Sequence, residues 1–379
     1  MKKKKIYFIT DYTFDNRDFF RYQIPLLAKE FKIKIISISD FVYPNLKLKK
    51  KTFNRKVKFF SNLQFFEHMQ KNFENIIVVD LMTVTFKTQY IRFLLKMNNI
   101  KYVKIYMTQF PSPNDLKRNI IQKIYFKLFI FKGKEKVFLL IKNKIVYFFN
   151  FYLKPDLVIS GGEYLNKYFI KKNINNVNFI SYDYHLAKGK KKNLIKKNYV
   201  VFVDSGILGN RDYELYKVTN FKNKESYEKK LNLFFKNIEK TYDLKVVIAA
   251  HPKSDKNVIK KAFKDYKIEF NKTVDLIKYS KFIMIHTSTA ISSAIIFKKP
   301  VFLLSMDEFN NSWILKEIEY FSKILKLKII DIDHHRNFSK LKFNFDKMSY
   351  ANYENNYLKS SYVKYSNFGN KILKTFCEL

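Results

Sequence analysis

Short apolar runs alternate along the chain with stretches in which apolar residues recur every three or four positions. Helical spacing is clear in NRDFFRYQIPLLAKEF (16–31), where Pro25 must interrupt the helix. Strands that alternate with amphipathic helices indicate a parallel α/β sheet. In the first half the apolar runs are KIYFIT (5–10), KIKIISIS (32–39), NIIVVDLM (75–82), KYVKIYMT (101–108) and PDLVISGG (155–162).

A second series of the same kind occupies the second half of the chain. A long helix is predicted over KESYEKKLNLFFKNIEKTY (224–242) and another over STAISSAIIF (288–297). The apolar runs of this series are YVVFVDSG (199–206), KVVIAAHP (245–252), KFIMIHT (281–287), KPVFLLS (299–305) and KIIDID (328–333).

Two such series predict an α/β protein with two Rossmann-like domains that face a cleft. The N-terminal domain is predicted at 1–185 and the C-terminal domain at 199–350. Between them, LAKGKKKNLIKKN (186–198) is highly charged, and its apolar residues follow neither helical nor strand spacing, which is typical of a linker. Residues 351–379 are expected to form C-terminal helices that pack back on the N-terminal domain.

The charge of the chain narrows the class of partner. Its 379 residues include 73 basic and 33 acidic ones, for a formal net charge of +40. Nucleic-acid-binding proteins have such charges, but base readout and planar phosphate clamps favour arginine, and only seven of the basic residues are arginine. The lysines are scattered among Ile, Phe, Tyr and Asn, all encoded by A/T-rich codons. We expect no nucleic-acid partner, whereas sugar nucleotides and anionic lipid headgroups would be attracted.

Cysteine usage and hydropathy indicate the compartment. The single cysteine, Cys377, cannot form a disulfide within the chain, which fits a reducing cytoplasm. No apolar run approaches the roughly 20 uncharged residues of a spanning helix. Residues 120–154 are apolar with a lysine every few positions, so their aromatic face either packs on the protein's own core or lies on an anionic membrane. We expect a cytoplasmic protein, at the inner face of the plasma membrane in the second case.

The few glycines exclude two classes of nucleotide-dependent enzyme. The chain has seven, and the first is Gly133, so the first strand–helix turn has no GxGxxG and the chain no GxxxxGK[ST]. We therefore expect neither a dinucleotide-dependent oxidoreductase nor a P-loop nucleotidase, and no cofactor.

Polar side chains follow three predicted strands of the second series. Ligands of open α/β sheets bind outside the carboxyl ends of the strands, and hydroxyl residues at a helix start cap N–H groups at an end that attracts anions. Helix capping alone explains the hydroxyl residues at 287–289, but it does not explain the polar residues at 204–206 and 251–252. The pattern therefore predicts a phosphate site. The residues are Asp204, Ser205 and Gly206; His251 and Pro252; and Thr287, Ser288 and Thr289.

HPKS (251–254) followed by HTSTAISSAIIFKKPVFLL (286–304) resembles GT-B glycosyltransferases of bacterial surface-polysaccharide synthesis, above all sialyltransferase-type and capsule enzymes. Those enzymes carry an acidic-acidic-Gly motif, a His-Pro motif and a Ser-Ser/Thr motif in this order. The matches here are residues 204–206, 251–252 and 288–289, and the resemblance covers about the second half of the chain. Ser205 stands where the family has its second acidic residue.

The resemblance implies an inverting, metal-independent glycosyltransferase with an N-terminal acceptor domain and a C-terminal nucleotide-sugar donor domain. His251 would donate a hydrogen bond or a proton to the leaving phosphate, and Asp204 would be the base, with Asp11 and Asp15 as rivals. Asp307 and Glu308 either bind ribose hydroxyls or lie in a solvated loop. The remaining nucleotide- or phosphate-binding residues would be Gly206, Pro252, Lys253, Thr287, Ser288 and Thr289.

The donor implied by the resemblance is a nucleotide-activated sugar, with a CMP-activated nonulosonic acid as one option. The acceptor would be a glycan or lipid-linked precursor of a capsule or lipooligosaccharide. Alternatives are a CDP-glycerol-type polyol-phosphate transferase, a sugar-nucleotide epimerase of the same fold, or a non-catalytic basic module that binds nucleic acid or anionic lipid. DIDHH (331–335) has metal-ligand types, but adjacent residues of a strand point to opposite faces, so we expect no metal site.

Overall fold

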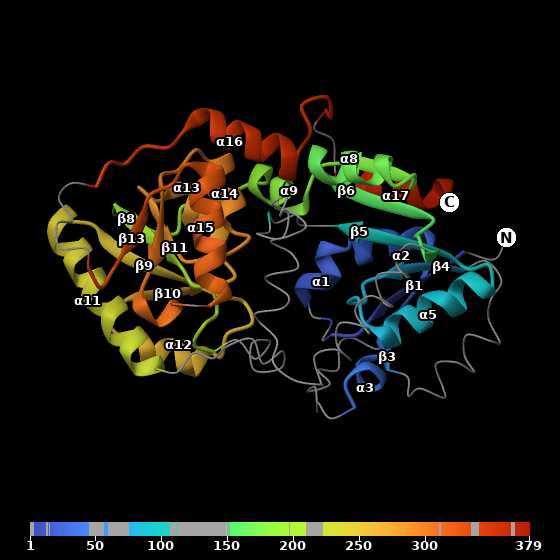
Figure 1. Cartoon of the computed structure of the whole chain (residues 1–379), viewed down its shortest axis with the longest axis horizontal. Helices are drawn as coiled ribbons and strands as arrows, with labels where there is room; N and C mark the ends of the chain where they lie inside the picture. The colour runs from blue at the N-terminus through green and yellow to red at the C-terminus, as the bar shows by residue number, and fades with distance from the viewer. Residues whose placement is uncertain are drawn as a thin grey trace, which may run out of the picture. The chain divides into compact units, whose positions relative to one another are not determined.

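The structure is a computed structural model that describes residues 4–12, 14, 16–44, 57–59, 76–106, 111, 149, 152–196, 198–209, 223–310, 312–334, 341–364 and 368–379. These residues form two compact units (Figure 1). The first contains the described residues up to 106, from 149 to 180, and from 362 to 379. The second contains residue 111 and the described residues from 181 to 361.

The first unit is built on a parallel sheet with the strand order β3-β2-β1-β4-β5-β6-β7. Its strands are β1 (Lys5–Thr10), β2 (Lys32–Ser37), β3 (Val57–Phe59), β4 (Ile76–Asp80), β5 (Lys101–Tyr106), β6 (Leu157–Gly161) and β7 (Asn176–Phe179). Its helices are α1 (Asn16–Arg21), α2 (Ile24–Glu30), α3 (Ser39–Val42), α5 (Phe86–Met97), α8 (Glu163–Lys171) and α17 (Phe368–Glu378).

Local sequence explains where these elements begin. Pro25 lies in the first turn of α2 and separates it from α1, as the sequence predicts, because proline has no N–H to donate inside a helix. Helix α5 begins after Thr85, whose side chain accepts a hydrogen bond from the N–H of Thr88 in a capping box. Strand β1 is buried on both faces from Ile6 to Thr10, as is typical of a central parallel strand.

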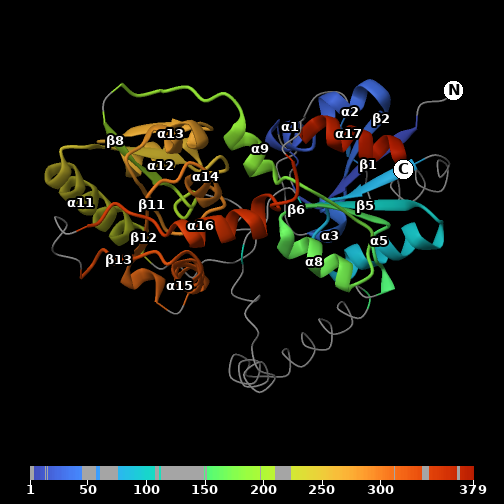
Figure 2. The same ribbon diagram turned by 90° about the horizontal axis from the view of Figure 1, so that it is seen from above.

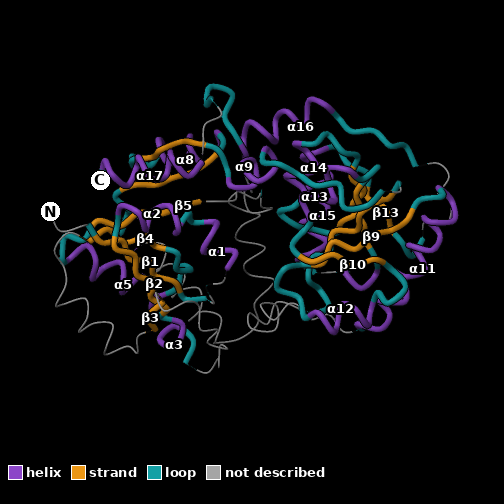
Figure 3. The backbone as a smooth tube through the Cα atoms, turned by 180° about the vertical axis from the view of Figure 1, so that it is seen from behind, coloured by secondary structure: helices purple, strands orange, loops and turns teal. Residues whose placement is uncertain are grey.

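The second unit has a parallel sheet with the order β10-β9-β8-β11-β12-β13, and the strands of each unit lie between helices (Figure 3). Its strands are β8 (Tyr199–Val203), β9 (Lys245–Ala250), β10 (Lys267–Phe270), β11 (Ile283–Ile285), β12 (Val301–Ser305) and β13 (Ile329–Asp331). Its helical elements are α9 (Tyr182–Lys188), α11 (Lys224–Tyr242), α12 (Lys256–Ala262), α13 (Thr273–Tyr279), α14 (Ile291–Ile296), the 3₁₀ turn η2 (Asp307–Phe309), α15 (Trp313–Leu325), α16 (Lys347–Tyr353) and the π-helical η4 (Glu354–Leu358).

Strand β8 shows how the second sheet is covered on both sides. The ring of Phe202 contacts Phe235 of α11 and Phe263 at the end of α12, at centroid distances of 5.0 and 6.2 Å. Tyr199, three residues earlier and therefore on the other face, donates a hydrogen bond from its hydroxyl to Leu276 O of α13. Both faces of the sheet are thus packed against helices, which explains the continuously apolar strands.

The α/β class with two Rossmann-like domains, predicted from the sequence, is confirmed. The sequence analysis did not predict β3 and β10, which are short strands at the sheet edges. It also did not predict the helices α9 and α15. The chain passes from the first to the second unit at residues 180 and 181, whereas the linker was predicted at 186–198, which begins inside α9. Of residues 120–154, only 149 and 152–154 belong to the described residues.

The end of the chain belongs to the first unit. Helix α17 lies beside α2 (Figure 2), and the ring of Phe376 contacts Phe31 at a centroid distance of 6.5 Å. Phe368, at the other end of α17, stacks on Phe179 of β7 at 5.6 Å. No helix within the described ranges is long and apolar enough to cross a membrane.

Candidate functional site

The sheet of the second unit has a switch point between β8 and β11, where the strand order reverses. Ligands of doubly wound sheets bind at such a point, outside the carboxyl ends of the strands. After β8 the chain reaches α11, which packs on the face of Phe202, and after β11 it reaches α14, which contacts α13 on the opposite face. The loops that follow β8, β9 and β11 therefore surround the position at which this topology binds ligands.

Asp204 follows β8 and joins two of these loops. Its side chain is only 3% exposed, and its carboxylate accepts the N–H of Gly206 at 2.8 Å and the N–H of His251 at 3.1 Å. It also accepts the hydroxyl of Ser254 at 3.3 Å. Burial raises the pKa of Asp204, and these hydrogen bonds oppose the rise. With both oxygens engaged, Asp204 holds the His251 loop in place; its role as the base stays a prediction.

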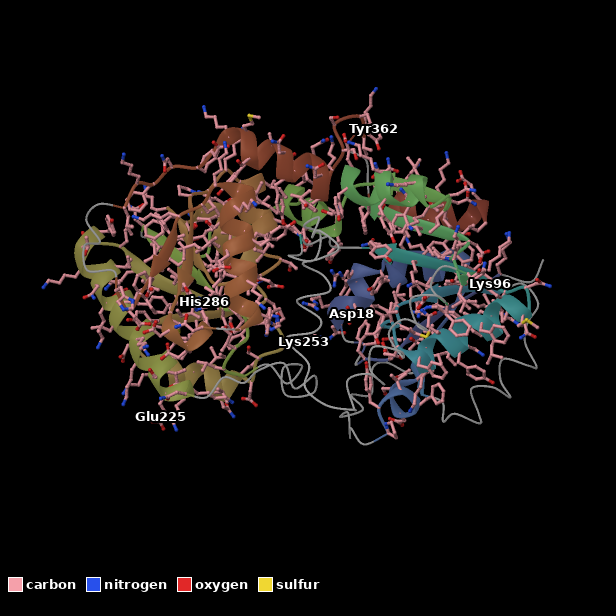
Figure 4. The ribbon with its side chains drawn as sticks, viewed as in Figure 1. Asp18, Lys96, Glu225, Lys253, His286 and Tyr362 are labelled. Atoms are coloured by element: carbon pink, nitrogen blue, oxygen red, sulfur yellow. The ribbon has the colours of Figure 1, made fainter. Side chains whose placement is uncertain are left out.

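The His251 loop is a turn whose shape gives the imidazole a defined tautomer. The N–H of Ser254 donates to His251 O at 3.0 Å, which closes a four-residue turn with Pro252 in its second position, where proline is favoured. The N–H of Lys253 donates to Nδ1 of His251 at 3.2 Å. Because Nδ1 accepts, the neutral ring carries its proton on Nε2, which is then a donor. His251 and Lys253 are both partly exposed, and Lys253 is labelled in Figure 4.

Thr287 after β11 contacts the β8 loop and a helix. Its N–H donates to the hydroxyl of Ser205 at 3.3 Å, so the loops on either side of the switch point are directly joined. Its hydroxyl donates to Oε2 of Glu317 on α15 at 2.6 Å. Burial raises the pKa of Glu317, and the hydrogen bond from Thr287 opposes the rise.

Glu317 was missed by the reading of the sequence. The buried positions of α15 include Ile314, Ile318 and Phe321, which recur at helical spacing. Glu317 lies between them in the pattern, one turn after Ile314, so it is an acidic residue next to the buried face of an amphipathic helix. That position was the signal, and it was overlooked because α15 itself was not recognised.

Ser288 and Thr289 lie in a turn before α14. The hydroxyl of Ser288 accepts the N–H of Ala290 at 3.3 Å, and Thr289 is exposed. The helix begins at Ile291 and is only six residues long, so the start predicted at residue 288 is wrong by three residues. The physical reason is that Ser288 bonds the backbone two residues ahead, which favours a turn over a helix. This hydrogen bond within the turn occupies one lone pair of Ser288, and α14 itself has no side-chain cap.

His286, at the end of β11, is buried inside the second unit (Figure 4). Its Nδ1 lies 2.7 Å from Leu304 O and therefore donates, while Nε2 accepts from the hydroxyl of Tyr227 at 3.1 Å. The side chain is fully buried, and burial lowers the pKa of His286 to about 4. His286 is thus a neutral residue of the core that joins β12 to α11.

Glu308, expected at the ribose, belongs to a separate ionic cluster. It lies 2.8 Å from the Nζ of Lys230, which is also 2.8 Å from Asp333, and it accepts the hydroxyl of Ser226. Asp307 is exposed, and its N–H donates to Asp333 at 2.8 Å. These contacts connect η2 and the end of β13 to α11. The hydrogen bonds of Thr287 described above lead instead to Ser205 and Glu317.

The other candidate carboxylates and ligands are distributed as follows. Asp11, in the first unit, is buried and accepts both the N–H and the hydroxyl of Thr83 as well as the hydroxyl of Tyr43. Asp15 and His335 lie outside the described residues. Asp331 pairs with His334 at 3.1 Å, and the described ranges contain no group of three or more His, Cys, Asp or Glu that could hold a metal ion.

Comparison with known proteins places this arrangement among solved folds. No protein-family model matches the chain, and no curated protein matches it significantly. The wall teichoic acid polymerase TagF, solved as a histidine-to-asparagine variant with CDPG, matches with a TM-score of 0.56 at 14% identity, over 100% of this chain and 90% of that chain. The UDP-GlcNAc 2-epimerase from Methanocaldococcus jannaschii matches with a TM-score of 0.50 at 13% identity, over 99% of this chain and 100% of that chain. At such identities the likeness establishes the fold alone: two Rossmann-like domains of the GT-B type.

Proposed function

We propose that the chain is a glycosyltransferase that moves a sugar from a nucleotide-activated donor to a glycan or lipid-linked acceptor. The observation that carries the proposal is the His251 loop. A buried carboxylate, Asp204, holds this loop beside the switch point, and Nε2 of His251 is a donor there. A donor that is fixed in advance stabilises the charge that develops on a leaving phosphate. The GT-B-type fold supports the same class of reaction.

The reaction is a displacement at the anomeric carbon. An acceptor hydroxyl forms the new bond to this carbon and gives up its proton, while the bond to the phosphate oxygen breaks and its electron pair leaves with the nucleotide. His251 donates a hydrogen bond or a proton to that phosphate. Gly206, Pro252, Lys253, Thr287, Ser288 and Thr289 would surround the phosphate, since all of them lie in the loops after β8, β9 and β11.

The base remains open among three carboxylates. The carboxylates of Asp204 and Asp11 already accept several hydrogen bonds each from neighbouring loops. Asp15 lies beyond the described residues. The donor and the acceptor are proposed from the motif pattern: a CMP-activated nonulosonic acid and a surface glycan such as a capsule or lipooligosaccharide, made in the cytoplasm without a cofactor or metal.

A polyol-phosphate transferase is the second candidate, favoured by one observation. TagF, which shares the fold, is a polymerase of wall teichoic acid, and its structure was solved with CDPG. A transferase of this kind would also need donors aimed at the leaving phosphate, so the His251 loop does not separate the two functions. The epimerase alternative rests on the likeness to the UDP-GlcNAc 2-epimerase.

The nucleotide identifies the donor class, and thermal unfolding measures it. The full chain is incubated with CMP, CDP, UDP or GDP, and the nucleotides of one base should raise its melting temperature. At a hundredfold excess over Kd, the free energy of unfolding should increase by about 2.7 kcal/mol. A shift with CMP would favour a cytidine donor, since transfer from a CMP-activated sugar and transfer of a polyol phosphate from a CDP-polyol both release CMP. A shift with UDP or GDP would favour a sugar nucleotide of that base, and the product of the reaction then separates a transferase from an epimerase.

The variant His251→Ala should lose most of this shift while it unfolds at nearly the wild-type temperature without nucleotide, because His251 is partly exposed. His334→Ala, another exposed histidine of the second unit, is the matched control and should keep the shift. If none of the four nucleotides stabilises the chain, or if His251→Ala keeps the full shift, the proposed role of the His251 loop is wrong.

A further inference from the structure

Helix α5 of the first unit has its apolar residues on the outside. Its inward face contains Thr88, Gln89 and Arg92 beside Ile91 and Leu95, all buried. Its outward face, which we call the α5 stripe, consists of residues at helical spacing, and each is between 41% and 66% exposed. The α5 stripe is Phe86, Tyr90, Phe93 and Met97.

The polar inward face is explained by a buried ion pair. The guanidinium of Arg92 donates to Asp80 at 2.7 and 3.2 Å, and also to Met82 O and Thr83 O at the end of β4. Thr88 accepts a further hydrogen bond from Arg92 at 3.3 Å. These contacts hold α5 on the sheet in one rotation, so the stripe cannot turn inward.

The stripe continues onto the chain segment before β6. Tyr152 is 63% exposed, and together with Phe149 and Leu153 it lines a hollow of about 440 Å³ with Phe93 and Met97. A second hollow, of about 260 Å³, lies between Phe86, Gln89, Tyr90, Phe93 and Phe149. Aromatic and thioether side chains around two adjacent hollows form a contiguous apolar surface. Surfaces of this kind mark sites of interaction.

Elsewhere among the described residues, exposed apolar side chains are fewer on each element. On α8 of the first unit, Tyr164 and Tyr168 are one turn apart, and Ile170 lies on the same helix. In the second unit, Leu233 is on α11, Val258 on α12, Tyr279 on α13 and Met348 on α16, each on a different element. Single exposed apolar residues are ordinary on protein surfaces. The stripe is therefore a local feature of the first unit, distinct from the general aromatic richness of the chain.

The charge around the stripe indicates what covers it. Of the basic residues between 81 and 106, Arg92 and Lys104 pair with the buried Asp80, whereas Lys87, Lys96 and Lys101 are at least partly exposed. The ammonium groups of Lys87 and Lys96 lie at the flanks of α5, on Phe41 O and on Asp156, and Lys96 is labelled in Figure 4. An apolar, aromatic band with cations beside it complements an anionic bilayer surface, where rings enter the headgroup boundary and lysines meet the phosphates.

We propose that the α5 stripe, together with Tyr152, binds the surface of an anionic lipid bilayer. Tyr90 and Tyr152 would enter at the boundary with their hydroxyls toward water, and Phe86, Phe93 and Met97 would reach the acyl region. The net charge of +40 adds an attraction that acts at longer range. The proposal is independent of the reaction at the His251 loop, because lipid binding and nucleotide binding are measured separately.

Sedimentation of the full chain with vesicles tests the proposal. The chain should sediment with vesicles that contain phosphatidylglycerol and much less with phosphatidylcholine alone. The variant Tyr90→Ser/Phe93→Ser/Met97→Ser should partition at least about tenfold more weakly, since three apolar contacts with the lipid are removed. Leu233→Ser, at a side chain 62% exposed on α11, is the matched control and should bind like the wild type.

A tryptophan placed in the stripe reports contact directly. Trp313, the single tryptophan, lies on α15 in the second unit and is the internal control. In Phe93→Trp, brominated lipids should quench additional fluorescence that they do not quench in the wild type. Wild-type binding by the triple variant would mean that lysines alone drive adsorption, and the proposal would be wrong.

Two further outcomes would also overturn the proposal. If the triple variant unfolds at a much lower temperature and no form binds vesicles, the stripe is covered by the chain itself. If the wild type is a dimer that the triple variant converts to a monomer, again without vesicle binding, the stripe is an interface between two copies.

Discussion

At the scale of single residues, two histidines at strand ends of one sheet have opposite roles. His251 is partly exposed in a turn, with Nδ1 accepting a backbone N–H, so that its other nitrogen carries the proton. His286 is fully buried, with both nitrogens bonded to other parts of the core. Both residues are histidines that directly follow an apolar run, so the sequence alone does not distinguish them. Burial and hydrogen-bond partners make one a candidate for chemistry and the other a structural element.

His286 should make stability depend on pH. Its pKa is about 4 in the folded chain because the ring is buried, against about 6.5 when unfolded. Between these values the unfolded chain binds more protons, so the free energy of unfolding should fall as the pH decreases from about 6.5 toward 4. The loss is at most about 3 kcal/mol, and the contribution is fully present above pH 6.5.

Urea unfolding at a series of pH values measures this dependence, and His286→Asn should flatten it over that window, since asparagine does not titrate. The variant His334→Asn removes an exposed histidine and should leave the slope nearly unchanged. An equal slope in wild type and His286→Asn would contradict the assignment.

The role of Asp204 can be separated from that of a base. In Asp204→Asn the amide would place a donor against an N–H or hydroxyl donor, since all three partners of the carboxylate donate to it. We expect a loss of about 1–3 kcal/mol in unfolding free energy, because a buried donor is left without an acceptor. Nucleotide affinity should fall as well, because the His251 loop is displaced. Unchanged stability and affinity with a large loss of turnover would instead identify Asp204 as the base.

At the scale of elements, the loops at the switch point depend on backbone shape. Gly206 has φ of 79°, in the left-handed region that side chains with a Cβ disfavour. Gly206→Ala should therefore reduce the free energy of unfolding by about 1–2 kcal/mol. Gly189 has φ of −64°, and an added Cβ there would meet its neighbours at 3.5 Å or more, so Gly189→Ala is the matched control and should be nearly neutral. Equal effects of the two substitutions in denaturant unfolding would show that the turn is not strained.

The central strands could be predicted from the sequence because they are buried on both faces and appear as uninterrupted apolar runs. The edge strands β3 and β10 are three and four residues long and carry lysine, so they give no such signal. The α14 start was misplaced because Ser288 bonds within a turn, and α9 was partly read as linker because its end is followed by lysines. The loops of residues 204–206, 251–252 and 287–289 were correctly attributed to adjacent strand ends. The contacts of Asp204, Glu308 and Glu317 depend on tertiary packing and were not visible.

At the scale of the whole molecule, the two units repeat one topology. In both sheets the order of the first six strands reverses between the first and fourth, which are β1 and β4 in one unit and β8 and β11 in the other. Both switch points also have a buried aspartate after the first strand, Asp11 and Asp204, and each of these accepts N–H groups from a neighbouring strand end or loop. In each unit a carboxylate therefore fixes the loops at the edge of the sheet where ligands of this topology bind.

The stretch 181–361, which contains every described residue of the second unit except 111, begins and ends at adjacent positions. The N–H of Ser181 donates to Leu358 O at 2.7 Å. In topological terms, this stretch is an insertion before the C-terminal helix of the first unit. Recombination at these two neighbouring positions would replace the inserted stretch with another one and leave the sheet of the first unit intact. In this way a lineage of related chains could change the second unit while it kept the first.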